Sequence, residues 1–325
     1  MMATLKDVAR KTGFSVAVVS RALNPRPDQH ARVASATRRQ LIRTAREMGF
    51  RRNRMAEFMR RGGLPTVGVF LPAAANRLVA DLVFGISEVL SEEDFPLQIG
   101  FDSYVEGFRK FIRHNVDLAH SGIISYPTLI SDPDVEKEVA DYRSKGGKVV
   151  LLNTSVRLDG VPVISIDDKK GGRLAAERLL ARRCVRFAVL GSLSGRNEGF
   201  QQFLATAGKS ALACQDDASG LRAIFRFCRE ASACRPAGIF AVTDVLALRI
   251  FRALSATSLQ AGRDVLVIGY DDLDLTSEIT PALTTLHQPF REEGRLAARK
   301  LIHMINGGQE ASVLIPPRLV IRQSG

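Results

Sequence analysis

The chain has 325 residues, enough for two or three compact units, and its hydrophobic content of 46% is ordinary for a globular protein. No apolar run approaches the roughly 20 residues that span a bilayer, and the N-terminus lacks the apolar segment of a signal peptide. With a formal net charge of +12, the composition predicts a basic, cytoplasmic protein without a membrane partner.

Two short helices with a turn between them are predicted at the start of the chain. Thr4 and Asp7 have the spacing of a capping box, and an apolar stripe gives the first helix an inner face. After Gly13, Ser15 can cap a second helix that runs to Leu23. Neither helix is long enough to be stable alone. We therefore expect them to pack as a helix-turn-helix, whose second helix can enter the major groove of DNA.

The positive charge is concentrated in this part of the chain. Residues 1–61 contain fifteen Lys and Arg against four Asp and Glu, a net charge of +11, which leaves about +1 for the remaining 264 residues. Two small core helices without a special function would produce the same turn pattern, but not this concentration of charge. A positive field confined to a small module is typical of nucleic-acid binding, since each neutralised phosphate releases counterions.

A third helix and a basic segment complete this module. The pattern over residues 36–48 predicts a helix that ends at Gly49, with its arginines, Arg38 among them, facing out. The following segment, 50–61, is basic and carries apolar side chains such as Met59 with nothing of its own to pack against. It is either a disordered linker or a helix that folds on a partner. On DNA, an apolar side chain of such a helix can wedge between base steps from the minor groove.

From residue 66 onward the pattern changes to alternating strands and helices. Six apolar runs predict strands buried on both faces, and stretches between them, such as 173–181 and 244–254, have helical periodicity. This is the pattern of a parallel α/β fold, in which ligands bind beyond the carboxyl ends of the strands. No glycine-rich nucleotide motif follows a strand, which gives little support to a nucleotide-dependent enzyme. The predicted strands are 66–71, 122–125, 148–153, 187–191, 238–242 and 265–270.

The sequence indicates neither a metal nor a cofactor. The five histidines are scattered, and the four cysteines lack the close paired spacing of a zinc site, so we expect buried free thiols. Asp167 and Asp168 are adjacent carboxylates, but neighbouring side chains on a strand point to opposite faces, which argues against an acid–base pair. The cysteines are Cys184, Cys214, Cys228 and Cys234.

The motifs of the chain resemble those of the lactose/galactose-repressor (LacI/GalR) family of bacterial transcription regulators. Near the N-terminus the resemblance lies in residues 4–9 (TLKDVA) and 19–24 (VSRALN). Further along, the order and spacing of several short motifs argue against coincidence. These motifs are 165–168 (SIDD), 196–200 (RNEGF), 240–244 (FAVTD), 269–272 (GYDD) and 281–289 (PALTTLHQP).

The resemblance implies a fold and a function. The fold is an N-terminal all-α helix-turn-helix headpiece followed by a two-lobed, parallel α/β core like that of the periplasmic binding proteins. The headpiece takes residues 1–61, with a hinge helix at about 53–60; a linker follows at 62–65, and an effector-binding and dimerisation core takes 66–325. The implied function is that of a homodimeric repressor, associated with the nucleoid, which binds a pseudo-palindromic operator in double-stranded DNA and responds to a small molecule between its lobes.

The resemblance also places the DNA contacts in the second helix and the hinge. Val16 and Ala17 occupy positions that face base edges, where apolar side chains can contact a thymine methyl group but cannot make bidentate hydrogen bonds. Arg21 can read guanine, so direct hydrogen-bonded readout depends heavily on it. The remaining expected contacts are Ser15, Ser20 and Asn24 in the headpiece and Asn53, Met55 and Met59 in the hinge.

For the effector site, the resemblance singles out Arg196 and Asp271. A guanidinium and a carboxylate from different loops can together bind the vicinal hydroxyls of a sugar or sugar derivative, or the polar edge of a nucleobase. The weaker expected contacts are Asn76, Asn153, Asp244 and, as an apolar wall, Ile166.

Two other functions stay open on the sequence alone. A family member can be controlled by a protein partner or not gated at all, and Leu78 favours this, because it stands where the family often has a Phe near the ligand. A solute-binding or sugar-modifying protein is the third candidate. The basic headpiece and the absence of a signal peptide argue against it, and no Ser or Cys nucleophile has a placed His partner, so we expect no enzyme.

Overall fold

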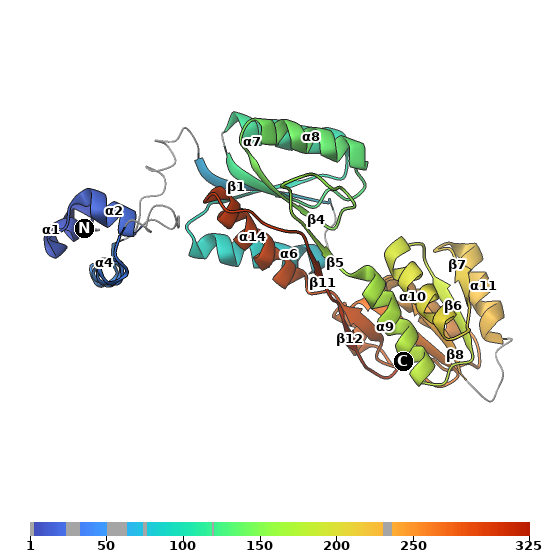
Figure 1. Cartoon of the computed structure of the whole chain (residues 1–325). Coiled ribbons are helices and arrows are strands. Elements are labelled where there is room, and N and C mark those ends of the chain that lie inside the picture. The colour runs from blue at the N-terminus through green and yellow to red at the C-terminus, as the bar shows by residue number, and fades with distance from the viewer. Residues whose placement is uncertain (1–2, 24–32, 51–63, 74–76, 119, 230–235) are drawn as a thin grey trace. The chain divides into compact units, whose positions relative to one another are not determined.

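The structure is a computed structural model, and it describes residues 3–23, 33–50, 64–73, 77–118, 120–229 and 236–325 (Figure 1). The predicted hinge helix at about 53–60 and the first half of the predicted linker at 62–65 lie outside these ranges, whereas residues 64 and 65 already belong to a strand. Within the described ranges, no helix combines the length and apolar content that crossing a membrane requires.

Three helices form the start of the chain: α1 (Leu5–Thr12), α2 (Val16–Ala22) and α4 (Ser35–Glu47). The capping box predicted for α1 is confirmed. The Thr4 hydroxyl accepts the backbone N–H of Asp7, whose carboxylate in return accepts the N–H of Thr4 at 2.9 Å. Both bonds satisfy donors that would otherwise be unpaired at the helix start.

The turn and the second cap also agree with the prediction. Gly13 has φ +73°, a left-handed conformation that favours glycine, and the Ser15 hydroxyl accepts the N–H of Val18 at 3.3 Å. Helix α2 ends at Ala22, one residue before the predicted end. The prediction that Arg38 faces out is wrong, because this side chain is half-buried. The core between the three helices consists of Val8, Ala9, Val19, Ala22, Leu41 and Ala45.

A first sheet of six strands follows, in the order β11-β5-β4-β3-β1-β2. Strand β1 pairs in parallel with both β2 and β3, β3 pairs in parallel with β4, and β5 pairs in parallel with β11. Strand β2 is an edge of this sheet. The strands are β1 (Leu64–Leu71), β2 (Leu97–Phe101), β3 (His120–Ser125), β4 (Lys148–Leu152), β5 (Val163–Ile166) and β11 (Val313–Ile315). The helices of this part are α6 (Arg77–Glu92), α7 (Val105–Asp117), α8 (Asp132–Ser144) and α14 (Phe290–Ile305).

A second six-stranded sheet has the order β12-β10-β9-β8-β6-β7. All neighbouring pairs in it are parallel except β10 with β12, which is antiparallel. The strands are β6 (Arg186–Leu190), β7 (Ala211–Cys214), β8 (Ala237–Ala241), β9 (Val265–Asp271), β10 (Thr284–His287) and β12 (Arg318–Val320). The helices are α9 (Asp168–Ala181), α10 (Ser194–Thr206), α11 (Ala218–Arg229), α12 (Asp244–Leu254) and α13 (Leu275–Glu278).

The described chain forms two compact units, each assembled from separate stretches of sequence. The first unit contains 1–73, 87–163 and 296–312, and the second contains 74–86, 164–295 and 313–325. All six apolar runs predicted as strands are strands, namely β1, β3, β4, β6, β8 and β9. The α/β fold class predicted from the sequence is therefore confirmed.

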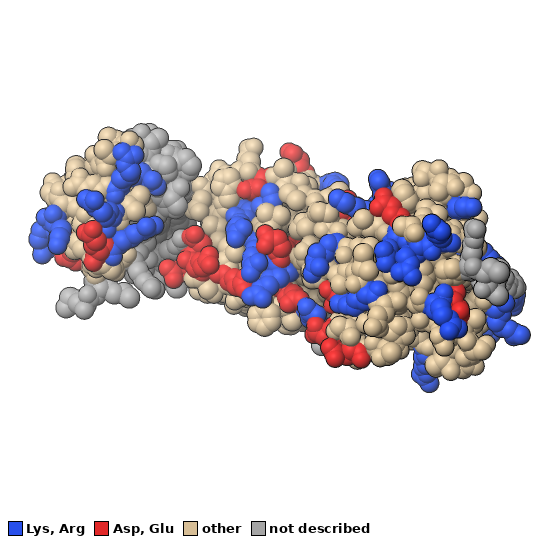
Figure 2. Space-filling model, turned by 90° about the horizontal axis from the view of Figure 1, so that it is seen from below, with Lys and Arg blue, Asp and Glu red and all other residues tan. Residues whose placement is uncertain are grey.

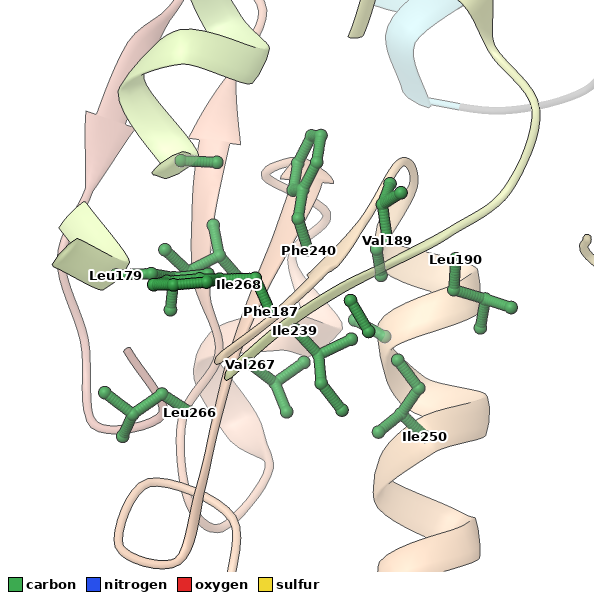
Figure 3. Packing of buried hydrophobic residues seen from close by; sticks show 14 of the residues in the cluster. Leu179, Phe187, Val189, Leu190, Ile239, Phe240, Ile250, Leu266, Val267 and Ile268 are labelled. Atoms are coloured by element: carbon green, nitrogen blue, oxygen red, sulfur yellow. The ribbon is translucent and has the colours of Figure 1, made fainter. Parts of the chain in front are cut away.

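The core of the second unit explains why its central strands are apolar throughout. All five residues of β8 are buried, and Figure 3 shows Ile239 of this strand beside Val267 and Phe187 of the neighbouring strands, with Ile250 of α12 close by. Strands covered by helices on both faces need no polar face. The expectation of buried free thiols is confirmed for the three cysteines that the structure describes. These are Cys184, Cys214 and Cys228, whereas Cys234 lies outside the described residues.

Candidate functional site

Helix α2 presents a small, distinct outer face. Val16 is 41% exposed, and Ala17 and Arg21 are exposed as well, whereas Val19 and Ala22 are buried against α1 and α4. The buried positions are three residues apart and pack the helix against its neighbours, so the residues on the opposite side are not needed for packing. The three residues expected to face base edges therefore share the solvent-facing side of α2.

The other expected DNA contacts have varied surroundings. Ser15 is exposed, and its hydroxyl already caps α2, so any phosphate it contacts must share that oxygen. Ser20 is half-buried. Four expected contacts lie outside the described residues: Asn24, Asn53, Met55 and Met59.

The exposed charges around these helices are mostly positive. On the headpiece face seen in Figure 2, most of the coloured side chains are Lys and Arg. The two described ion pairs here are long and exposed: Arg10 to Asp7 and Arg43 to Glu47, each at 3.8 Å. Exposed pairs of this kind are worth little, so they leave the positive field of the headpiece nearly intact.

A second polar cluster lies in the second unit, beyond the carboxyl ends of its parallel strands. Arg196 is in the first turn of α10, which follows β6, and its side chain reaches residues from four other segments. Its Nε donates to Asp168 at 3.0 Å, one terminal nitrogen donates to the carbonyl of Val242 at 2.7 Å and to Asp271 at 3.4 Å, and the other donates to Gln288 at 3.2 Å. The sequence prediction paired Arg196 with Asp271, and the structure brings the two together.

The cluster is closed by three more contacts. Gln288 donates to Asp271 at 2.7 Å, the hydroxyl of Tyr270 donates to Asp168 at 2.9 Å, and the guanidinium carbon of Arg196 lies 3.7 Å from the centre of the Tyr270 ring. Burial by itself would lower the pKa of Arg196, but the charges of Asp168 and Asp271 outweigh it and raise the pKa. The guanidinium is therefore a fixed positive charge, held by cation–π contact and hydrogen bonds.

Asp271 is the most perturbed carboxylate of this cluster. Burial raises its pKa to about 7, against the opposing effect of Arg196. Its backbone has φ +126°, a conformation that L-residues rarely adopt, and the following residue, Asp272, has φ +56°. Strained backbone at a polar cluster is characteristic of functional sites.

Asp244 has hydrogen-bond partners within its own unit. It is fully buried, and its two carboxylate oxygens accept the N–H of Leu273 at 2.8 Å and the hydroxyl of Thr285 at 2.6 Å. Asp244 thus fixes the loop that follows β9 and carries Asp272. Asp272 in turn pairs with Arg322 at 2.7 Å and with the His287 ring at 2.9 Å.

The remaining expected effector contacts are spread over the fold. Ile166 is buried at the end of β5 and belongs to the second unit, whereas Asn153, with φ +47°, follows β4 in the first unit. Asn76 lies outside the described residues. Asp167 and Asp168 do not lie on a strand, as the sequence argument against an acid–base pair assumed, but at the start of α9. They still have separate partners, because Asp167 caps α9 by accepting the N–H of Lys170 at 2.9 Å, whereas Asp168 accepts from Arg196 and Tyr270.

Three members of the cluster were missed by the sequence reasoning: Asp168, Tyr270 and Gln288. Each lies inside or next to a motif used for the family resemblance, in SIDD, GYDD and HQP. That position was the only available signal, because their partners are distant in sequence. Asp168 and Tyr270, for example, are 102 residues apart.

Known protein families match both parts of the chain. The model of bacterial regulatory proteins of the lacI family matches residues 4–53, and the model of the periplasmic binding protein-like domain matches residues 176–325. The ribose operon repressor of Escherichia coli K12 is 27% identical over 99% of this chain and all of its own length. The PurR transcriptional repressor of Photobacterium profundum is 25% identical over 99% of this chain and 98% of its own.

Solved structures match the fold over the whole chain. The Lac repressor bound to ONPG in the repressed state is 26% identical, covers 100% of both chains and has a TM-score of 0.68. The complex of the transcriptional regulator CelR with cellobiose is 23% identical, covers 99% of this chain and 100% of its own, and has a TM-score of 0.69.

Proposed function

This chain belongs to the LacI family of bacterial regulatory proteins, and we propose that it represses transcription as a homodimer on a pseudo-palindromic operator, under the control of a small molecule. It is a DNA-binding regulator with a periplasmic-binding-protein-like effector domain, and not an enzyme. We place it in the cytoplasm, on the nucleoid. The headpiece takes residues 1–61 and the core 66–325 in this proposal.

The observation that carries the DNA-binding proposal is the outer face of α2. Arg21 is exposed there beside Val16 and Ala17, on a module that holds a net charge of +11. Arg21 reads a guanine through two hydrogen bonds, and the two apolar side chains contact thymine methyl groups. Phosphate contacts from Ser15, Ser20 and Asn24, and the hinge residues Asn53, Met55 and Met59, position the module.

The effector proposal rests on the Arg196 cluster. Arg196 and Asp271 offer a fixed donor fork and a carboxylate at the carboxyl ends of parallel strands, where α/β proteins bind ligands. A hydroxyl-rich ligand suits this pair, because each hydroxyl can accept from the guanidinium and donate to the carboxylate. A sugar or sugar derivative is therefore the proposed effector class, with a nucleobase as the second choice.

The weaker expected contacts have two kinds of role in this proposal. Asn76, Asn153 and Ile166 line the ligand, while Asp244 holds the loop after β9 in place. The relatives are consistent with this class of ligand: one of the curated relatives is named for the ribose operon, and one of the solved structures is a cellobiose complex.

The homodimer proposal is supported by exposed apolar side chains. On the edge strand β2, Ile99 is 37% and Phe101 57% exposed, and Tyr104 just beyond it is 77% exposed. The second unit exposes Val245 and Leu275 by 49% and 57%. Exposed apolar groups that gather on an element mark interaction surfaces, and an edge strand is a ready surface for a second copy.

One experiment tests the proposal as a whole. The full-length protein is used to select binding sites from a random DNA pool, and the selected DNA is then titrated with the protein in the presence of single sugars and nucleobases. We expect a pseudo-palindromic consensus and at least one ligand that changes operator affinity roughly tenfold or more. Random sequences after selection would refute DNA readout, whereas a consensus that no ligand affects would favour control by a protein partner or no gating.

A further inference from the structure

We propose that the second unit has a separate binding site for a small molecule that carries a phosphate monoester, at the end of the sheet opposite the Arg196 cluster. A cavity of about 580 Å³ lies there between the starts of β6 and β7 and the last turns of α11. This volume is in the usual range for small-ligand sites and too small for a folded partner.

The cavity is lined by positive charge. Arg186, Lys209 and Arg226 all contribute to its wall, and no carboxylate does so among the residues that the structure describes. Three cations around one cavity repel each other and favour an anion of high charge density. A phosphate monoester carries up to two negative charges and three acceptor oxygens, which matches this set better than a single carboxylate does.

For two of the cations, the part of the chain that the structure describes holds no ion-pair partner. Lys209 and Arg226 form no ion pair with any described residue, and Lys209 is exposed in the loop before β7. Arg226 also lies in the last turn of α11, where a cation is favoured by the helix dipole alone. The dipole accounts for one positive residue at this end, but not for Lys209, which comes from another element.

An aromatic ring and a hydroxyl complete the wall. The guanidinium of Arg186 lies 4.9 Å from the centre of the Phe227 ring, so this side chain is held in place by a cation–π contact. Ser210, next to Lys209, adds a hydroxyl donor to the same wall. A positioned guanidinium, a flexible ammonium and a hydroxyl are the groups that bind phosphate oxygens.

The cavity is distinct from the effector cluster. Arg186 is the first residue of β6, whereas Arg196 is reached only after the strand has ended at Leu190. The five residues of β6 separate the two sites by roughly 15 Å along the strand. A ligand in the cavity therefore leaves Arg196 and Asp271 accessible, and both sites can be occupied together.

Phenyl phosphate and benzenesulfonate are suitable probes, because they share a ring and differ in charge. Hydrogen–deuterium exchange of the full-length protein is measured with each at constant ionic strength. We expect phenyl phosphate to protect residues 208–214 and 223–229, and benzenesulfonate to protect them less. The highly basic headpiece also attracts anions, so the position of the protected residues distinguishes binding in the cavity from binding to the headpiece.

The matched variants test which charges are responsible. Lys209→Gln with Arg226→Gln removes two charges from the wall, and we expect roughly tenfold weaker binding of phenyl phosphate or more. Arg229→Gln is the control, because Arg229 is exposed in the same last turn but does not line the cavity. Unchanged binding in the double variant, equal losses in the control, or protection confined to the headpiece would overturn the proposal. A melting temperature within a few degrees of that of the unmodified protein is required of each variant.

Discussion

At the scale of single residues, the two proposed functions depend on two arginines in opposite situations. Arg21 is exposed on the outer face of α2, whereas Arg196 is 8% exposed and donates four hydrogen bonds to its own chain. Substitution of the first changes only binding, while substitution of the second also removes the positive charge that pairs with Asp168 and Asp271, which is costly. Arg21 is therefore the cleaner test of DNA recognition.

We predict that Arg21→Ala weakens specific operator binding by about 1–3 kcal/mol and relaxes the preference for guanine at one position in each half-site. Gel-shift titrations against the selected operator and its single-base variants measure this. Arg39→Ala, an exposed arginine on α4, is the control and should weaken all DNA sequences alike. An Arg21→Ala protein that keeps its sequence preference would remove this residue from the recognition set.

Asp271 gives a prediction about pH. Burial raises its pKa from 3.8 to about 7, so the folded protein binds this proton more tightly than the unfolded chain does. The associated stability is complete below about pH 4 and is lost as the pH rises through about 7. The Asp271→Asn side chain cannot ionise. As the pH rises through this window, the free energy of unfolding of the variant should therefore increase relative to that of the unmodified protein, by up to about 1.4 kcal/mol per pH unit.

Urea denaturation of both proteins between pH 4.5 and 8 measures the effect (the window follows from the pKa of about 7). Asparagine has the same shape as aspartate, so the packing and backbone at this position should be retained. A difference between the two proteins that does not change with pH would show that Asp271 is ionised throughout.

At the scale of elements, the position of Arg196 is set by the contact of α9 with α10. A Cβ atom on Gly172 would lie 1.9 Å from the backbone carbonyl of Arg196, and one on Gly199 would lie 2.0 Å from that of Lys169. The two helices approach so closely that only glycine fits at these positions. This contact brings Arg196 near Asp168, which begins α9.

We predict that Gly172→Ala moves α10 away from α9 and destabilises the protein by about 1–3 kcal/mol, even though alanine favours helix. Lys170→Ala, exposed on the same helix, is the control and should change stability by less than about 0.5 kcal/mol. Denaturation midpoints measure both. If Gly172→Ala is as stable as the control, the helices can separate without cost and the contact does not fix Arg196.

Some strands could be predicted from the sequence and others could not. Long apolar runs predicted β1 and β9 because strands covered on both faces leave no polar position to confuse the pattern. Edge strands such as β2 and β7, and the three-residue strands β11 and β12, were not predicted. They are short, partly exposed and held by pairing with distant strands, which a local pattern does not contain.

The residues and contacts of the candidate site also fall into a predicted and an unpredicted group. Arg196 and Asp271 were predicted together, because a charged residue at a family motif is visible in the sequence. The bond from Tyr270 to Asp168 depends on segments 102 residues apart, and no spacing rule predicts it. Asp244 was expected near the ligand. The residues around it in the sequence do not indicate that Leu273 and Thr285 donate hydrogen bonds to its two carboxylate oxygens.

At the scale of the whole molecule, the proposed function requires two copies, since one helix such as α2 reads only half of a palindrome. We predict that Phe101→Lys, a charge on the exposed face of edge strand β2, shifts the protein toward monomer and lowers operator affinity at least roughly tenfold. Leu129→Lys is the control, because Leu129 is 85% exposed but lies in a loop. Sedimentation velocity and gel shifts measure the two effects. A Phe101→Lys dimer of unchanged affinity would exclude β2 from the interface.

The engagement of Arg196 has a further consequence for the sensitivity of the proposed regulator. Oxygen atoms of Asp168, Val242, Asp271 and Gln288 accept hydrogen bonds from the guanidinium in the structure. Ligand binding is then an exchange of one set of hydrogen bonds for another, and only the difference contributes to affinity. Such a receptor binds its ligand less tightly than one whose guanidinium has no partners in its own chain, because those hydrogen bonds must first be given up. It also ranks related ligands by how well they replace the geometry of the chain's own oxygens, and not by how many hydroxyls they carry.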